Sequence, residues 1–219
     1  MISGNGLSKS FGGRVAVSEV TLQVEPGEVV GFLGPNGAGK TTTMRMLLGV
    51  LRPDNGSVEV RGPVGYLPET FAAYDALSVR SYLRFMAKMK SVTSASVDEA
   101  MQRAGVEDLA ARPVGRLSKG QRQRTAMAQA LLGSPPSYVL DEPTIGLDPK
   151  QIVDARNVIR EMGRESAVLL STHLLAEAAS VCDRVIVIVK GRVVAEQATA
   201  SAPDLEDRFL RLVAEAELA

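Results

Sequence analysis

The chain has 219 residues, of which 45% are apolar and 23% are charged, and its 25 basic residues balance 25 acidic ones. A net charge of zero gives no reason to expect nucleic acid or an anionic membrane as a partner. The single cysteine, Cys182, excludes an internal disulfide, and no apolar run approaches the roughly 18 residues of a membrane helix. The first residues lack the basic and apolar regions of a secretory signal. We therefore expect a globular, cytosolic chain of one domain; if it works at a membrane, another chain does the spanning.

Two strands are expected before residue 34. Val20, Leu22 and Val24 alternate with polar residues, which is typical of a strand with one buried face. The turn-forming residues 25–28 separate it from the apolar run 29–33, which predicts a buried strand. The first strand belongs to a small antiparallel element.

The buried strand ends in a glycine-rich loop at residues 34–41, and a helical pattern follows it. Glycine adopts positive φ at little cost, so backbone N–H groups can turn toward one point, where a helix N-terminus adds about half a positive charge. Lys40 would reach the β- and γ-phosphates of a nucleoside triphosphate, and the Thr41 hydroxyl would bind Mg²⁺. A chance glycine-rich turn is the alternative, but the full pattern G-x-x-x-x-G-K-[ST] stands in its required strand–loop–helix setting. The residues assigned to the nucleotide here are Gly34, Pro35, Asn36, Gly37, Ala38, Gly39, Lys40, Thr41 and Thr42.

An aromatic residue, Phe11, stands beside a flexible turn near the start of the chain. It fits either a platform on which a base stacks or an ordinary core residue, and the neighbouring residues favour neither. Further along, residues 53–56 (Pro-Asp-Asn-Gly) predict a turn, and short strands are expected over 57–61 and 64–67.

From Tyr74 onward the pattern becomes helical. Ser78 is expected to cap a first helix, because apolar residues recur after it at helical spacing. Residues 96–99 (Ser-Val-Asp-Glu) predict a capping box that opens a second helix, which stops near Gly105. A third helix is expected over 120–132, with glycine and proline beyond it.

This helical stretch is rich in aromatic and methionine side chains for a chain with only 4% aromatic residues. Such side chains either pack in a core or form a surface that receives a partner. They are Phe71, Tyr74, Tyr82, Phe85, Met86 and Met89.

Two carboxylates, Asp141 and Glu142, follow the short apolar strand 138–140. Ligands bind at the carboxyl ends of strands in α/β sheets, and phosphoryl transfer needs one carboxylate for Mg²⁺ and another that activates water. The alternative is a pair of solvated surface carboxylates. Asp148 is expected to cap the next helix, with Pro149 at its first position.

The only histidine, His173, follows another apolar strand at 167–170. A structural role and a ligand contact both fit a histidine at the carboxyl end of a strand. A further β-branched strand is expected over 184–189, and a terminal helix that packs back on the sheet over 201–216.

Six motifs, in content, order and spacing, resemble the ATP-binding subunit of an ABC transporter. They are GPNGAGKT at 34–41, YLPE at 66–69, LSKGQ at 117–121, VLDEP at 139–143, GLD at 146–148 and finally His173. The resemblance covers nearly the whole chain. LSxGQ followed by a strand that ends in Asp-Glu separates this family from other phosphate-loop proteins.

The resemblance implies an ATPase that uses ATP and Mg²⁺. The implied catalytic residues are Lys40, Glu142 as general base and His173 at the γ-phosphate, while Thr41 and Asp141 hold Mg²⁺. The further nucleotide contacts that it implies are Phe11, for adenine stacking, Glu69, Ser118, Gly120 and Asp148.

The resemblance also implies partners. In the family, two subunits pack head to tail, so Ser118 and Gly120 of one copy close over the γ-phosphate bound at Lys40 of the other. We therefore expect a homodimer, or a pair with a related subunit, in the ATP state. A separate transmembrane permease is expected to dock around residues 69–86, which places the chain at the cytoplasmic face of the membrane. No nucleic acid is expected.

The chain departs from the family pattern at two positions. Glu69 replaces the usual glutamine, which resembles the branch that exports drugs, antibiotics and polysaccharides and favours export over import. Lys119 replaces the first glycine of LSGGQ and adds a side chain where backbone packs near phosphate. The change is tolerable if Lys119 is not held at positive φ, and its charge could then aid the γ-phosphate.

The expected fold is α/β, a P-loop NTPase core of RecA-like type with a small antiparallel β subdomain and an inserted α-helical subdomain. The core spans 1–69 and 135–199, the helical subdomain spans 70–134 and carries LSKGQ, and 200–219 form a C-terminal helix. One alternative is a non-transport ABC ATPase, a nucleotide-driven clamp on a macromolecule, although those resemble tandem or coiled-coil-inserted chains. Another is a small-molecule kinase, which would not need LSKGQ.

Overall fold

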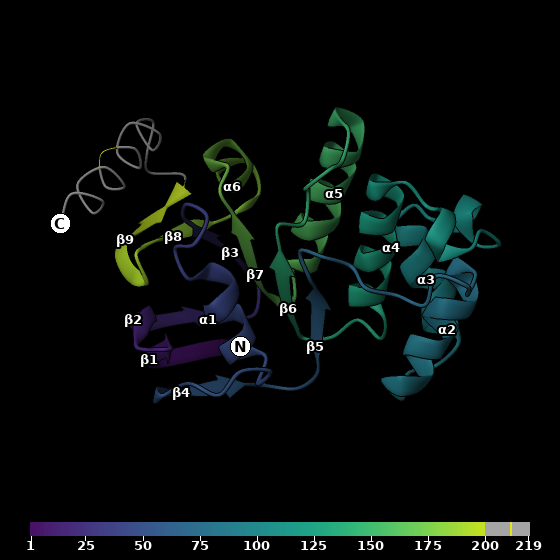
Figure 1. Ribbon diagram of the computed structural model, residues 1–219. Coiled ribbons are helices and arrows are strands. Elements are labelled where there is room, and N and C mark those ends of the chain that lie inside the picture. Colours follow the sequence, from purple (N-terminus) through teal and green to yellow (C-terminus); the bar gives the residue numbers. More distant parts are fainter. Residues whose placement is uncertain (200–210, 212–219) are drawn as a thin grey trace.

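The computed structural model describes residues 1–199 and Arg211 (Figure 1). Apart from Arg211, the terminal helix expected over 201–216 lies outside the described residues. The strands are β1 (Ile2–Phe11), β2 (Arg14–Val24), β3 (Glu28–Leu33), β4 (Asn55–Val60), β5 (Val64–Leu67), β6 (Ser137–Asp141), β7 (Ala167–Thr172), β8 (Arg184–Val189) and β9 (Arg192–Ala198). The helices are α1 (Lys40–Leu47), α2 (Val79–Met89), α3 (Ala95–Arg103), α4 (Lys119–Leu131), α5 (Pro149–Met162) and α6 (Leu175–Val181), with 3-10 turns η1 (Glu107–Leu109) and η2 (Val114–Arg116).

The strands form two sheets. A three-stranded antiparallel sheet has the order β2-β1-β4, and a six-stranded sheet has the order β5-β6-β7-β3-β8-β9. In the larger sheet every neighbouring pair is parallel except β8 and β9. Figure 1 shows the antiparallel sheet below α1, with the helices α2, α3 and α4 gathered at the opposite side of the molecule.

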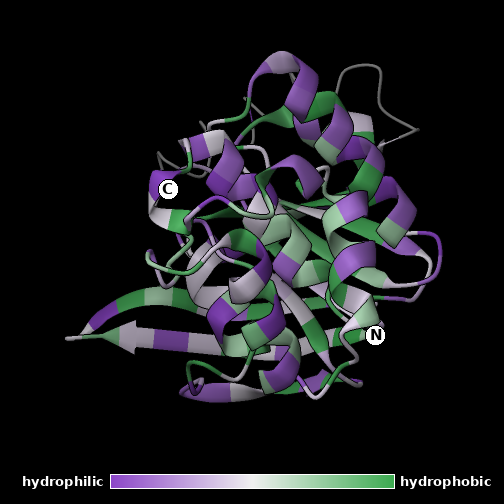
Figure 2. Ribbon diagram, turned by 90° about the vertical axis from the view of Figure 1, so that its right-hand side faces the viewer, coloured by the Kyte–Doolittle hydropathy of each residue, from purple (hydrophilic) through white to green (hydrophobic). Residues whose placement is uncertain are grey.

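The larger sheet is covered on both faces, which explains why its strands read as continuous apolar runs. Side chains alternate across β7: Ala167 and Leu169 face a cluster with α1 and the antiparallel sheet, whereas Val168 and Leu170 face a cluster with α4, α5 and α6. In Figure 2 the central strands carry mostly hydrophobic residues, while the helices mix both kinds. The predicted α/β core with an antiparallel sheet and inserted helices is therefore confirmed.

The parallel strands end at one edge, and this edge positions the site. The register pairs Leu33 of β3 with Thr172 of β7, and Asp141 of β6 with Ser171 of β7. The glycine-rich loop leaves β3 there, and Glu142 and His173 follow β6 and β7 directly. Three segments that lie far apart in the sequence therefore meet at one place.

The structure confirms the predicted start of the first inserted helix but not that of the second. Ser78 caps α2, since its hydroxyl accepts a hydrogen bond from the Ser81 N–H at 3.2 Å. The capping box expected at 96–99 is wrong: α3 begins earlier, at Ala95, and the Ser96 hydroxyl instead donates to the Thr93 carbonyl at 2.7 Å. A capping box does occur at α4, where the Ser118 side chain and Gln121 satisfy each other's backbone N–H groups.

Strand β1 was not expected from the sequence, because its small and polar residues show no clean alternation. It gains its hydrogen bonds from β2 on one side and β4 on the other. None of the helices in the described part of the chain has the length and apolar character needed to cross a membrane.

Candidate nucleotide site

The loop between β3 and α1 has the backbone geometry that its glycines allow. Gly37 has φ 80° and Gly39 has φ 107°, both in the left-handed region. A Cβ on Gly39 would also lie 2.7 Å from the Ala16 carbonyl oxygen. Gly39 is the N-cap of α1 and supplies no side-chain hydrogen bond. The first N–H groups of α1 are therefore left to an anion.

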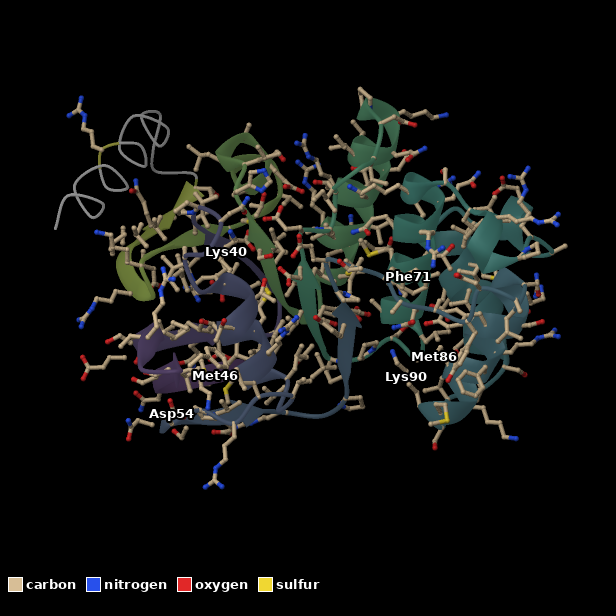
Figure 3. All side chains as sticks on the ribbon, viewed as in Figure 1. Lys40, Met46, Asp54, Phe71, Met86 and Lys90 are labelled. Carbon is tan, nitrogen blue, oxygen red and sulfur yellow. The ribbon has the colours of Figure 1, made fainter. Side chains whose placement is uncertain are left out.

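Lys40 is the first residue of α1, where it lies beside the carboxyl edge of the sheet (Figure 3). It is only 7% exposed, and its ammonium donates to the carbonyls of Gly34 at 2.6 Å and Pro35 at 3.2 Å. Its Nζ also lies 3.9 Å from Oε1 of Glu142. Burial lowers the pKa of Lys40, and the nearby carboxylates, Glu142 foremost, oppose this effect. This buried cation can form charge-assisted hydrogen bonds to phosphate oxygens.

Two oxygen donors lie together beside Lys40. The Thr41 hydroxyl donates to Oδ2 of Asp141 at 3.1 Å, and Asp141 is 1% exposed. The Ser171 hydroxyl, which the sequence did not single out, donates to Oδ1 of Asp141 at 2.5 Å and fixes that carboxylate. A hydroxyl and a carboxylate at one point are the hard oxygen ligands that Mg²⁺ takes together with waters and phosphates. This donor set fits the metal.

Glu142 and His173 face each other. Both carboxylate oxygens of Glu142 lie 3.0 Å from Nδ1 of His173. The Glu142 backbone has φ 50°, a strained value for a residue with a side chain, and its N–H bonds to Ser171. Burial raises the pKa of Glu142, while the hydrogen bond with His173 opposes the rise. The carboxylate is thus a better proton acceptor than an exposed one.

Gln123, on α4, holds the backbone at Glu142, although no sequence pattern marked it. It is 5% exposed, and its side-chain amide donates to the carbonyls of Glu142 at 3.2 Å and Pro143 at 3.1 Å. The strained backbone at Glu142 is therefore held from two sides, by Ser171 and by Gln123.

A cavity of about 390 Å³ joins these groups. The predicted site residues in its wall are Pro35, Asn36, Gly37, Ala38, Gly39, Lys40, Thr41, Thr42, Glu69, Asp141, Glu142 and His173. Ala16, from β2, and Ile145 complete the wall. Gly34 lies just outside it and serves instead as an acceptor for Lys40. The lysine, the hydroxyl and the carboxylates in this wall suit a phosphorylated ligand that binds together with a cation.

Phe11 lies at the end of β1 and is 51% exposed, so core filling is excluded for it. The Lys9 ammonium lies 5.8 Å from the centre of its ring. The hairpin that carries Phe11 also brings Ala16 to the cavity wall. Phe11 does not itself line the cavity among the described residues, but its ring is exposed enough to stack on a flat ligand.

Three other predicted contacts, Ser118, Gly120 and Asp148, do not line the cavity among the residues that the structure describes. Ser118 caps α4, and Asp148 caps α5 by accepting the Gln151 N–H at 2.9 Å, as the sequence predicted. A Cβ on Gly120 would lie 2.6 Å from Oε1 of Gln151, so the two helix starts are packed closely. These residues therefore lie outside the cavity that contains the phosphate loop.

Lys119 begins α4 between those residues. Its backbone is helical rather than left-handed, so the replacement of glycine causes no strain. Its side-chain carbons pack against Gly146, where an added Cβ would lie 2.7 Å from Cδ and Cε of Lys119.

The fold and the site define a phosphate-loop nucleoside triphosphatase. Residues 17–145 match the ABC transporter family. The ABC transporter ATP-binding protein YxlF of Bacillus subtilis, itself uncharacterized, is 36% identical over 204 residues, which cover 88% of this chain and 69% of that protein. The chain belongs to the ABC transporter family, as its motifs predicted, and it is an ATP-binding, ATP-hydrolysing subunit.

Two relatives carry names that describe transport. The bacitracin transport ATP-binding protein BcrA of Bacillus licheniformis is 34% identical over 90% of this chain and 69% of its own. The Nod factor export ATP-binding protein I of Burkholderia lata is 37% identical over 88% of this chain and 69% of its own.

Solved structures agree with the fold. An ATP-binding subunit of an ABC transporter superposes with a TM-score of 0.84 at 28% identity, covering 100% of this chain and 98% of its own. A dimeric bacterial ABC transporter cassette superposes with a TM-score of 0.85 over 91% of this chain and 99% of its own, but at 24% identity it supports the fold alone.

Proposed function

We propose that this chain powers the export of a substrate across a membrane by hydrolysing ATP for a separate permease. The observation that carries the chemistry is the Glu142 carboxylate, which stands between the Lys40 ammonium at 3.9 Å and the His173 ring at 3.0 Å in the cavity wall. The direction of transport is supported by Glu69, which replaces glutamine, and by the relatives named for bacitracin transport and Nod factor export.

The loop and Lys40 bind the triphosphate. Backbone N–H groups at the start of α1 provide donors for the phosphate oxygens, and Lys40 exchanges its bonds to Gly34 and Pro35 for bonds to the β- and γ-phosphates. The exposed Phe11 ring, which belongs to the same hairpin as the wall residue Ala16, would stack on adenine. The phosphate loop and this ring would thus bind the two ends of ATP.

Thr41 and Asp141 would hold Mg²⁺, with Ser171 fixing the carboxylate from behind. When bound, the metal neutralises charge that develops on the β- and γ-phosphate oxygens.

Hydrolysis then needs one proton transfer. Glu142 accepts a proton from a water whose oxygen forms a bond to the γ-phosphorus. The bond between that phosphorus and the bridging oxygen breaks, and its electron pair leaves with ADP. Burial, which raises the pKa of Glu142, makes it a stronger base for this step. His173 orients the carboxylate and approaches the γ-phosphate.

A second copy completes the site. Ser118, Lys119 and Gly120 stand at the N-terminus of α4, a place suited to an anion, yet they lie outside the wall of the described cavity. We infer that they serve the γ-phosphate of a second subunit, in a head-to-tail homodimer or with a related chain. ATP then stabilises the closed pair and hydrolysis releases it.

The permease would dock on the helical side. Tyr74, before α2, is 60% exposed, and Phe85, on α2, is 39% exposed; their rings form an edge-to-face pair with centres 5.5 Å apart. Met89, at the end of α2, is 67% exposed. An exposed aromatic and methionine surface suits a short apolar helix of a membrane protein. This docking would hold the chain at the cytoplasmic face of the membrane.

The experiment is recovery of the partner. A tagged Glu142→Gln variant, crosslinked in its native cells with ATP retained, should recover a polytopic membrane protein. Lys40→Ala, which should bind ATP more weakly, serves as the matched control and should recover less of the closed assembly. Recovery of ribosomes or DNA-bound proteins instead, with no membrane protein, would contradict the proposal and support the clamp alternative.

A further inference from the structure

Glu177, on α6, is a buried carboxylate with no part in the motifs described above. It is 3% exposed. One of its oxygens accepts a hydrogen bond from the Thr144 hydroxyl at 2.5 Å, and the other accepts one from the Thr172 hydroxyl at 2.7 Å. Thr144 lies two residues after Glu142, and Thr172 directly precedes His173.

Thr144 belongs to the loop that carries Glu142, and Thr172 is the last residue of β7, at the point where the loop with His173 begins. The hydrogen-bonded ladder between β6 and β7 ends at Asp141 and Ser171, so Glu142 and His173 lie beyond the last paired residues. Just past that point the Glu142 N–H still donates to Ser171 at 3.1 Å. The Glu177 carboxylate adds a tie farther along, since one oxygen binds the loop after Glu142 and the other binds the end of β7.

The Thr172 hydroxyl extends the connection to the backbone on the other side of His173. It accepts the N–H of Leu174 at 3.0 Å while it donates to Glu177. The residues before and after His173 are thus tied to one carboxylate. Glu177 lies behind the loops and does not line the nucleotide cavity in the described residues.

We infer that Glu177 is a positioning residue that holds Glu142 and His173 at their working separation. This inference rests on the proposed function, because it acts through the Glu142 base. Charge-assisted hydrogen bonds from two buried hydroxyls are shorter and stronger than neutral ones, so this connection is stiff. Loss of the carboxylate would let the two loops drift apart while the phosphate loop and Lys40 stay in place.

The first test separates turnover from binding. Glu177→Ala should lower kcat by about 10- to 100-fold, because a displacement of catalytic groups by roughly 1 Å costs about that much. The Kd for ATP should stay within about twofold, since the phosphate loop is untouched. Glu177→Gln keeps one acceptor and can donate to the other hydroxyl, so it should restore most of the turnover. Met162→Ala, a core truncation on α5, is the control that lowers Tm without lowering kcat.

A fold-only role predicts a different pattern. In that case Glu177→Ala would lower Tm and the fraction of molecules that bind ATP, while kcat per ATP-binding molecule stayed normal. That result, or an unchanged kcat with normal Tm, would overturn the inference. If Glu177→Ala fails to fold, Thr144→Val removes one of the two hydrogen bonds to Glu177, and Thr172→Val removes the other together with the bond from the Leu174 N–H. Each should lower kcat several-fold, and normal kcat in both would overturn the inference. Thr199→Val, whose hydroxyl donates to the Cys182 carbonyl at 2.6 Å, is the matched control.

A double-variant comparison identifies which part fails. In a Glu142→Gln background, Glu177→Ala should cause a much smaller further loss of turnover than in the wild type, because the base whose position it sets is already gone. If Glu142→Gln is inactive but Glu177→Ala is normal, only the positioning role is wrong. If Glu142→Gln itself turns over normally, the proposed base and this inference both fail.

Discussion

Lys40→Ala should weaken ATP binding, and the hydrogen bonds that the Lys40 ammonium makes set the size of the effect. The ammonium is 7% exposed, so folding has already removed most of its water, and it donates to two carbonyls, of Gly34 and Pro35. Hydrogen bonds with a charged partner are worth about 1.5–3 kcal/mol each. The two bonds from the ammonium to neutral carbonyls lie toward the low end of this range, and two bonds to phosphate, in which both partners are charged, lie toward the high end. The net loss is about 2–3 kcal/mol, or roughly 30- to 150-fold in Kd.

The assay is a direct titration with ATP and with adenosine. The loss should appear for ATP and be absent for adenosine, because Lys40 meets only the phosphates. Lys90→Ala is the matched control: Lys90 is also partly buried, burial also lowers its pKa, and its ammonium donates to the Gln129 carbonyl at 2.9 Å. Figure 3 shows it on the helical side, far from Lys40. Equal ATP affinity in wild-type and folded Lys40→Ala protein would refute the phosphate-loop assignment.

Three further outcomes are expected. Tyr74→Ala should uncouple ATPase activity from transport in reconstituted vesicles, while ATP binding is kept. Phe71→Ala is the control: it removes a buried ring that packs edge-to-face on Tyr82, so it should lower Tm instead. Mixing inactive Ser118→Arg protein with inactive Lys40→Ala protein should restore part of the ATPase activity. In a mixed dimer one composite site carries both changes and the other carries neither. A monomer with full ATPase activity would rule out the composite site. Asp148→Ala removes the cap of α5 and should cost about 1 kcal/mol, or roughly 2–4 °C in the nucleotide-free Tm; an unchanged Tm would show that the cap is dispensable.

The phosphate loop could be predicted because its chemistry and its backbone geometry are encoded in consecutive residues. Gly37 and Gly39 have the positive φ that the pattern requires, and Lys40 and Thr41 follow at the start of the helix. Asp148 was predicted as a cap for the same reason, since an N-cap depends on its immediate neighbours. Local sequence was sufficient for both.

The support behind the site could not be predicted in this way. Gln123 contacts the carbonyl of Glu142 across 19 residues, and Ser171 contacts Asp141 across 30. Glu177 contacts Thr144 across 33 residues. No spacing encodes these pairs, because they depend on how α4, β7 and α6 pack around the sheet edge.

The aromatic stretch shows why its two interpretations were not exclusive. Phe71 and Tyr82 are buried and pack edge-to-face, whereas Tyr74 and Phe85 are exposed. Both pairs have ring centres 5.5 Å apart. Spacing along this stretch does not decide between a core residue and a surface residue, since burial depends on which side the neighbouring helices cover.

The central claim is that this site hydrolyses ATP with Glu142 as the base, and nucleotide retention tests it most directly. Glu142→Gln protein is mixed with Mg²⁺ and ATP labelled at the α-phosphate, passed through a sizing column, and its bound nucleotide is identified. The amide keeps the shape of the side chain but accepts no proton, so turnover should fall by about 10²–10⁴-fold. We predict that the variant retains bound ATP in a dimer, whereas the wild type retains ADP. Bound ADP formed at the wild-type rate would contradict it.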